Sequence, residues 1–213
     1  MGGVKLMLSD EEIESFWKHR LLQSMRTVSP AFVVDNSNRS IIRELYQWVW
    51  HTSDMLDGKK GILLYGPVGS GKTTIMKGLQ VYMALINRLV YGCIRSDICF
   101  EMRSATEIAL RYSSQGLEAI NKWTDKSIAG HLIIDEIGRE ENAKHFGTAC
   151  NVIQTLLQLR YELRHNVLTF GTTNIDMADL SQFRGLYGDY VLDRVKEMFN
   201  IVHLGGASRR KWI

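Results

Sequence analysis

The chain has 213 residues, a length typical of one full domain, and 45% of its residues are hydrophobic and 23% charged, as in an ordinary globular protein. These values exclude a disordered tail, a collagen-like repeat and a small scaffold that depends on disulfides. The formal net charge of +3 permits contact with nucleic acid through a local basic patch, but it does not by itself indicate such contact.

The cysteines and the first residues predict a cytoplasmic protein. Cys93, Cys99 and Cys150 are odd in number and lack the spacing of a zinc site, which fits a reducing compartment. The opening MGGVKLMLSDEEIE carries acids where a signal peptide needs an apolar segment, and no stretch approaches the roughly 18 apolar residues of a membrane span. We therefore expect a soluble cytoplasmic protein without a membrane segment.

Helical patterns dominate the first fifty residues. Ser9 and Glu12 form a capping-box signature, which starts an amphipathic helix that ends near Met25. Residues 26–37 look irregular, and a second helix follows, with its apolar face between Ile41 and Val49.

From residue 61 onward, apolar strands alternate with helices. The predicted strands cover 61–65, 98–102, 131–135, 167–171 and 201–204. One predicted helix begins near Gly71, and the others lie within 105–126, 152–163 and 191–198. This alternation predicts an α/β domain with a largely parallel sheet.

The strongest motif directly follows the first strand and matches the phosphate-binding pattern GxxxxGK[ST]. Its glycines allow successive backbone N–H groups to surround phosphate oxygens, and the following helix adds its positive dipole end. Lys72 can reach the β- and γ-phosphates, and the Thr73 hydroxyl can bind magnesium. An ordinary glycine-rich turn is the alternative. The predicted nucleotide-binding residues are Gly66, Pro67, Val68, Gly69, Ser70, Gly71, Lys72, Thr73 and Thr74.

An acidic pair follows the strand that begins at His131. Asp135 comes at the carboxyl edge of a buried strand, where parallel sheets bind ligands, and is predicted to hold magnesium together with Thr73. Glu136 is the predicted general base that orients and deprotonates the attacking water. A surface pair of acids is the alternative, and Glu101, near the second strand, is a rival base.

A third motif, Thr172-Thr173-Asn174, is expected just beyond the strand 167–171. The Asn174 amide there can hydrogen-bond both the attacking water and the γ-phosphate. The alternative is a turn or helix cap before Asp176, because Thr and Asn favour such positions.

The order of these motifs, followed by YGDYVLDR at residues 187–194 and GASRR at 206–210, resembles the DnaC/IstB-like AAA+ ATPases, the bacterial or phage helicase loaders and transposition helpers. The resemblance covers about residues 30–213. It implies a three-layer AAA+ sandwich with a mainly parallel five-stranded sheet, preceded by a short helical extension, residues 1–29.

The resemblance also implies roles for arginines near the C-terminus. Arg194 would be an arginine finger that reaches the neighbouring subunit's nucleotide, with Arg184 as the second choice, and Arg210 would face the nucleotide. The alternative for Arg194 is a surface ion pair with Asp189 or Asp193. The alternative for Arg210 is that it belongs, with Arg209 and Lys211, to a basic tail that is solvated or touches DNA.

A helical insertion at about 104–126 would line a DNA path in such proteins. Arg111 and Lys122 would lie near phosphates, and Tyr112 and Trp123 would stack on bases. The charges in this stretch are nearly balanced, so an ordinary helix pair with its aromatics in the core is the alternative.

The motifs predict an ATPase that uses ATP and Mg²⁺. The resemblance implies that this ATPase assembles into an ATP-dependent oligomer and loads a replicative helicase on single-stranded DNA. Such loaders usually carry an N-terminal segment that grips the helicase. Here the helix in residues 1–29, with Phe16 and Trp17, is the candidate docking element. The alternatives are an IstB-like helper that directs a transposase on duplex DNA, a small-molecule P-loop kinase, and a nucleotide-binding scaffold without hydrolysis.

Overall fold

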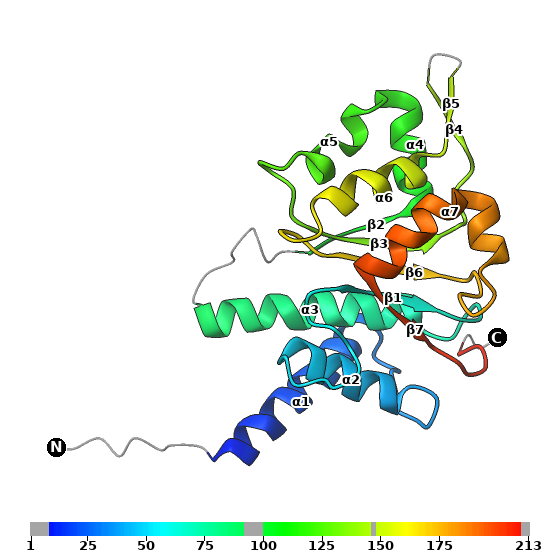
Figure 1. Ribbon diagram of the computed structural model, residues 1–213. Coiled ribbons are helices and arrows are strands. Elements are labelled where there is room, and N and C mark those ends of the chain that lie inside the picture. The colour runs from blue at the N-terminus through cyan, green and yellow to red at the C-terminus, as the bar shows by residue number, and fades with distance from the viewer. Residues whose placement is uncertain (1–8, 92–99, 146–147, 210–213) are drawn as a thin grey trace.

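The computed structural model describes residues 9–91, 100–145 and 148–209, and its centre is a five-stranded sheet in the order β2-β3-β6-β1-β7 (Figure 1). All four strand pairings of this sheet are parallel, which confirms the predicted α/β class. The strands are β1 (Gly61–Tyr65), β2 (Phe100–Ser104), β3 (His131–Ile137), β6 (Thr169–Thr173) and β7 (Phe199–His203).

Helices cover both faces of the sheet, so the molecule has three layers (Figure 1). The face below the sheet in this view carries α1 (Asp10–Val28), α2 (Arg39–Val49) and α3 (Lys72–Tyr91). The opposite face carries α4 (Ala105–Gln115), α5 (Glu118–Thr124), α6 (Val152–Glu162) and α7 (Ser181–Met198). The sandwich implied by the family resemblance is therefore confirmed.

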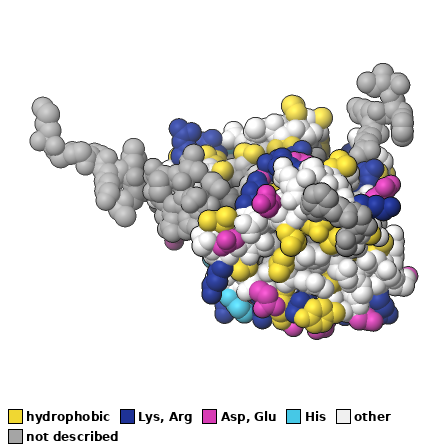
Figure 2. All heavy atoms as spheres, turned by 90° about the horizontal axis from the view of Figure 1, so that it is seen from above, with side chains coloured by type: hydrophobic (Ala, Val, Ile, Leu, Met, Phe, Trp, Pro, Cys, Tyr) yellow, Lys and Arg dark blue, Asp and Glu magenta, His cyan; other side chains and the backbone are white. Residues whose placement is uncertain are grey.

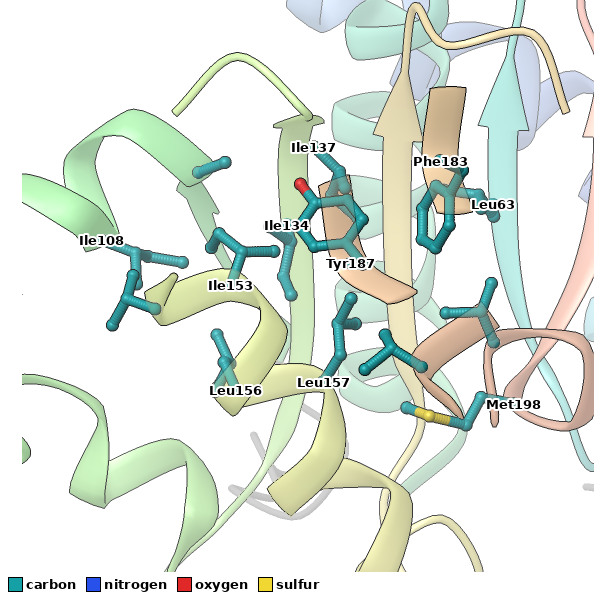
Figure 3. Packing of buried hydrophobic residues seen from close by; sticks show 14 of the residues in the cluster. Leu63, Ile108, Ile134, Ile137, Ile153, Leu156, Leu157, Phe183, Tyr187 and Met198 are labelled. Atoms are coloured by element: carbon teal, nitrogen blue, oxygen red, sulfur yellow. The ribbon is translucent and has the colours of Figure 1, made fainter. Parts of the chain in front are cut away.

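The central strands are buried on both faces, which explains their continuous apolar runs. On the α6 and α7 side, Ile134 and Ile137 of β3 meet Ile153 and Leu157 of α6 and Tyr187 of α7 (Figure 3). Gly61 is required at the start of β1, because a Cβ there would lie 1.7 Å from the carbonyl oxygen of Thr169.

The first helix belongs to the opposite core layer. Ser9 and Glu12 form the predicted capping box, with the Ser9 N–H donating to Glu12 at 2.8 Å. At the other end of α1, Leu21 and Met25 are fully buried in the cluster that includes α3. A Cβ on Gly78 of α3 would lie 2.1 Å from the Met25 sulfur. The C-terminal half of the 1–29 extension thus shares its core with the rest of the chain.

Several predicted boundaries differ from the structure by a few residues. β6 starts at Thr169, so Thr172 and Thr173 lie inside the strand rather than beyond it. α7 begins at Ser181 and has a kink at the non-helical Gly188, at φ 79°, and the helix predicted over 191–198 lies in the part after this kink. The helical stretches predicted within 105–126 are confirmed as α4 and α5, which Gly116, at φ 62°, separates.

A short antiparallel hairpin, β4 (Ala143–His145) and β5 (Thr148–Cys150), was not predicted. Its three-residue strands are too short to show the alternation that identifies a strand in sequence. The hairpin extends from the body of the molecule beside α4 (Figure 1).

Arg160 on α6 is a buried cation that sequence patterns did not single out. Its guanidinium donates to the Thr169 hydroxyl at 2.7 Å and to the carbonyl oxygens of Trp123 at 2.8 Å, Leu168 at 2.9 Å and Gly130 at 3.1 Å. Burial lowers the pKa of Arg160 to about 10, so the side chain stays charged at neutral pH. Its hydrogen bonds join α5, α6 and the segments that lead into β3 and β6.

Among the helices in the described ranges, none combines the length and hydropathy needed to cross a membrane.

Candidate active site

The predicted motifs converge on one pocket at the carboxyl edge of the sheet. β1 leads into the phosphate-binding loop, β3 delivers the acidic pair, and β6 delivers Asn174. The pocket has a volume of about 360 Å³. Its walls are formed by Ser29, Ala31, Phe32, Val33, Val68, Gly69, Gly71, Lys72, Thr73, Thr74, Glu136, Thr172, Asn174 and Arg209. The separate sequence signals therefore belong to one site.

The loop from Gly66 to Gly71 has the backbone that a phosphate cradle needs. Gly66, Gly69 and Gly71 all have positive φ, at 141°, 83° and 102°. A Cβ on Gly66 would lie 2.2 Å from the carbonyl oxygen of Leu204, and a Cβ on Gly69 would lie 2.2 Å from the Ser208 hydroxyl. Because α3 begins directly after the loop, at Lys72, its positive dipole end faces the same pocket. The loop therefore fits a bound phosphate chain.

Lys72 connects the phosphate-binding loop with Asn174. Its buried Nζ donates to the carbonyl oxygens of Gly66 at 2.7 Å and Pro67 at 2.9 Å, and to Asn174 Oδ1 at 2.8 Å. Burial lowers the pKa of Lys72, while the negative charges of Asp135 and Glu136 oppose that shift. The ammonium group and the amide predicted to contact the γ-phosphate are thus direct neighbours.

The residues predicted to bind magnesium also lie together. Thr73 Oγ1 donates to Asp135 Oδ1 at 2.9 Å, and Thr172 Oγ1 donates to the same oxygen at 2.6 Å. Hydroxyl and carboxylate oxygens are the ligands that Mg²⁺ prefers, usually from one or two protein groups together with substrate phosphates. The pair Thr73 and Asp135 fits such an ion. The contribution of Thr172 was missed, because the sequence pattern drew attention to the neighbouring amide.

Glu136 lies on the pocket wall in an unusual backbone conformation. Its φ is 58°, in the left-handed region, and the register of β3 against β6 shifts between Ile134 and Ile137. The Glu136 N–H donates to Thr172 Oγ1 at 2.9 Å, and its carboxylate forms an ion pair with Arg139 at 2.8 Å. Such a conformation costs about 1–3 kcal/mol and persists where the surroundings impose it, which is common at functional sites.

The rival base, Glu101, lies outside this pocket. It lines a separate cavity with Lys122 and Trp123, which donate to its carboxylate at 2.7 Å and 2.8 Å. Burial alone would raise the pKa of Glu101, but hydrogen bonds from Lys122, Trp123 and Arg103 outweigh that effect and lower it. Its geometry therefore favours an ion-pair role.

Arg194 lies on α7 and does not line the pocket. Its guanidinium stacks over the rings of Tyr190, at 3.7 Å, and Tyr161, at 4.6 Å, and forms an ion pair with Glu162 at 3.5 Å. The second candidate, Arg184, is paired with Asp189 at 2.5 Å. A role for either arginine at a neighbouring subunit's nucleotide stays a prediction.

The C-terminal arginine found in the pocket is Arg209. It donates through its backbone N–H to the Gly69 carbonyl at 2.9 Å, and its side chain contacts Asp35. The predicted Arg210 lies outside the described residues. In the sequence, only the family pattern distinguishes Arg210 from the adjacent Arg209.

The residues predicted to bind DNA are held by local contacts. Arg111 pairs with Glu107 at 3.1 Å, Lys122 pairs with Glu101 at 2.7 Å, and Tyr112 is half-buried against the core. Trp123 is only 2% exposed, so the expectation that it stacks on a base is wrong and the core alternative holds. On the face shown in Figure 2, basic side chains are mixed with acidic and hydrophobic ones instead of forming one stripe.

Comparison with known proteins identifies the family and the fold. The family model for the "ATPase family associated with various cellular activities (AAA)" matches residues 62–184. A search of curated protein sequences finds no significant match.

Several solved structures share the fold. A protein of Streptococcus pyogenes serotype M3, described as a primosome component, is 24% identical, with a TM-score of 0.60 over 91% of this chain and 97% of that one. DnaI is 21% identical (TM-score 0.59; 88% and 93% of the two chains), and the DnaC helicase loader is 14% identical (TM-score 0.55; 83% and 95%). With its phosphate-binding loop, acidic pair and parallel sheet in this arrangement, and with the family model covering more than half of its length, the chain belongs to the AAA family of ATPases.

Proposed function

We propose that this protein is an ATP-hydrolysing AAA+ protein that loads or remodels a replicative helicase on single-stranded DNA. The observation that carries the ATPase part is the meeting of three motifs in one pocket, shown by the contacts from Lys72 to Asn174 at 2.8 Å and from Thr73 to Asp135 at 2.9 Å. Residues that are far apart in the sequence thus provide the groups that phosphoryl transfer to water needs.

The residues divide the chemistry between them. Bound ATP with Mg²⁺ would supply the phosphoryl group and a positive charge beside its oxygens. The loop N–H groups and Lys72 bind the phosphates, and Thr73 and Asp135 hold the metal. Glu136 orients water and accepts its proton at a carboxylate oxygen, and the Asn174 amide positions that water against the phosphate.

An arginine from a neighbouring subunit would complete the site. Within one chain Arg194 is directed at Tyr161 and Tyr190 rather than at the pocket, so it would have to act on the nucleotide of a neighbouring subunit. An arginine finger supplied in trans accelerates phosphoryl transfer by about 10³–10⁵, so turnover should be slow until subunits assemble.

The helicase part of the proposal rests on the shared fold with the DnaC helicase loader and on α1. Ile13 and Phe16 on this helix are 42% and 40% exposed, while its other end is anchored in the core. A fixed helix with exposed apolar side chains at one end provides a contact surface for a partner protein.

Native mass spectrometry of the protein with its host's replicative helicase, ATP and single-stranded DNA tests the proposal. We expect a complex with the helicase that dissociates on hydrolysis, and that persists when Glu136→Gln blocks hydrolysis. Lys72→Ala, which removes phosphate binding, is the control. Assemblies on DNA that exclude the helicase would instead favour the transposition helper, and failure to bind ATP would overturn the ATPase assignment.

A further inference from the structure

The C-terminal tail crosses the phosphate-binding loop and reaches the opposite wall of the pocket. We propose that Arg209 is a positioning residue that fastens this wall, residues 31–37, to the phosphate-binding loop, and that the resulting clasp sets how long a nucleotide stays bound. The inference rests on the proposed nucleotide binding and adds to it a residue that controls affinity rather than chemistry.

One side of the clasp is the contact between the tail and the phosphate-binding loop. The Leu204 N–H donates to the Tyr65 carbonyl at 2.8 Å, which extends the pairing of β7 with β1. Further along, the Arg209 N–H donates to the Gly69 carbonyl at 2.9 Å, and its Nε donates to the Ser70 carbonyl at 3.2 Å. The tail therefore lies along the outside of the phosphate cradle.

The other side is the contact between the Arg209 guanidinium and the wall. One terminal nitrogen lies 2.9 Å and 3.0 Å from the two carboxylate oxygens of Asp35 and donates to the Ser37 hydroxyl at 2.8 Å. The other donates to the Val33 carbonyl at 3.4 Å. The planar guanidinium of Arg209 thus connects two separate segments of the pocket. A lysine ammonium, which is a point charge on a flexible chain, cannot reproduce this arrangement.

Hydrogen bonds within the wall and to Asn38 hold its residues together. Asp35 accepts from both the backbone N–H and the hydroxyl of Ser37, and the Asp35 N–H donates to the buried Asn38 side chain at 2.9 Å. Asn38 in turn donates to the Val33 carbonyl at 3.0 Å. Fixing Asp35 therefore fixes Val33, which lines the pocket.

The wall is apolar where it faces the pocket. Phe32 and Val33 both line the pocket, Phe32 buried and Val33 58% exposed, and Val68 on the phosphate-binding loop is 57% exposed. Apolar side chains that remain exposed beside a phosphate cradle gain free energy when a planar base covers them. The clasp thus joins the surface suited to the nucleoside base with the loop suited to the phosphates.

A direct role for Arg209 makes the opposite prediction for one variant. If Arg209 acted through its charge on the phosphates, Asp35→Asn would release the guanidinium, remove a nearby negative charge, and tighten nucleotide binding. If the clasp holds the wall, Asp35→Asn opens it and weakens binding.

Stopped-flow fluorescence with a mant-labelled adenine nucleotide on the full chain distinguishes the two. We expect Arg209→Ala and Asp35→Asn each to speed dissociation by about five- to tenfold, as for the loss of one ordinary hydrogen bond at a partly exposed site. Arg209→Lys should fall between the wild type and Arg209→Ala. The double variant should be no faster than either single one, because both changes open the same contact. At saturating ATP, kcat should stay within about twofold while KM rises.

The matched control is Arg43→Ala, an exposed arginine that contacts the Glu44 carboxylate at 3.4 Å. Faster dissociation in this control, slower dissociation in Asp35→Asn, or unchanged rates in both clasp variants would overturn the clasp. A wild-type chain that failed to bind the nucleotide would overturn the proposed function itself, so the two failures are distinguishable.

Discussion

At the scale of single residues, Glu136 shows how the backbone serves the site. The left-handed conformation of Glu136 and the register shift beside it turn this residue toward the pocket instead of along the strand. The Thr172 hydroxyl accepts the N–H of Glu136 and donates to Asp135, so one side chain holds both acids. The proposed metal ligand and the proposed general base are therefore positioned by the same local geometry.

We expect Glu136→Gln to reduce ATP turnover by about 10²–10⁴, the usual contribution of a general base, while nucleotide binding stays close to that of the wild type. Steady-state phosphate release and fluorescent-nucleotide titration measure the two properties. Glu101→Gln is the matched control and should leave turnover unchanged. If Glu101→Gln abolished turnover and Glu136→Gln did not, the assignment of the base would be wrong.

Asp35 predicts a pH dependence. Hydrogen bonds from the Ser37 hydroxyl and from Arg209 lower the pKa of this carboxyl from 3.8 to about 2. An acid with a lowered pKa stabilises the folded state fully above about pH 4, and that stabilisation is lost as the pH falls through about 2. Carboxyl ¹³C NMR titration should show a higher pKa of Asp35 in Arg209→Ala than in the wild type, and a larger increase in Ser37→Ala. An Asp35 that titrates near 3.8 in the wild type would contradict these contacts.

At the scale of elements, the two ends of α1 differ in burial. Met25, fully buried against α3, anchors one end, whereas Phe16 at the other end keeps 40% of its surface exposed. Met25→Ala should lower the free energy of unfolding by about 2–5 kcal/mol, because it leaves a cavity in the core. Phe16→Ala should lower it by less than about 1 kcal/mol, because the ring is already half exposed.

Urea unfolding followed by circular dichroism measures both variants. If α1 docks on a partner, Phe16→Ala weakens that complex although its stability is nearly unchanged. Equal destabilisation by the two substitutions would show that both ends of the helix belong to the core.

Elements with strong local signals could be predicted from the sequence, and those set by tertiary contacts could not. The capping box of α1, the loop after β1 and the acidic pair after β3 follow from residues that are adjacent in the chain. The start of α7 was missed because Gly188 interrupts its pattern. The roles of Thr172 and Arg209 depend on partners far away in the sequence, and no local pattern shows those.

At the scale of the whole molecule, the separation of Arg194 from the pocket predicts that activity depends on assembly. We expect Lys72→Ala and Arg194→Ala each to be inactive alone, because one lacks phosphate binding and the other lacks the finger. Mixing them in equal amounts should restore about a quarter of the wild-type turnover, since head-to-tail contacts then form some sites with both groups intact.

Phosphate release from the two proteins, alone and mixed, tests this at several total concentrations. Arg184→Ala replaces Arg194→Ala in a parallel mixture, to decide between the two arginines. A mixture that stays inactive would show that Arg194 does not act across a subunit boundary.

The contacts of Lys72 also have a consequence for nucleotide exchange. All three ammonium hydrogens have acceptors within the protein, two on the loop and one on Asn174. A phosphate can therefore accept a hydrogen bond from Lys72 only by replacing one of the acceptors that the lysine already has. The measured nucleotide affinity thus reports the difference between two sets of hydrogen bonds. Because one of the replaceable acceptors is the Asn174 amide, arrival and departure of a nucleotide would each change the hydrogen bonding of the residue that directly follows β6. The hydrogen bonds of the site would thus differ between the empty and the occupied state before any bond is cleaved.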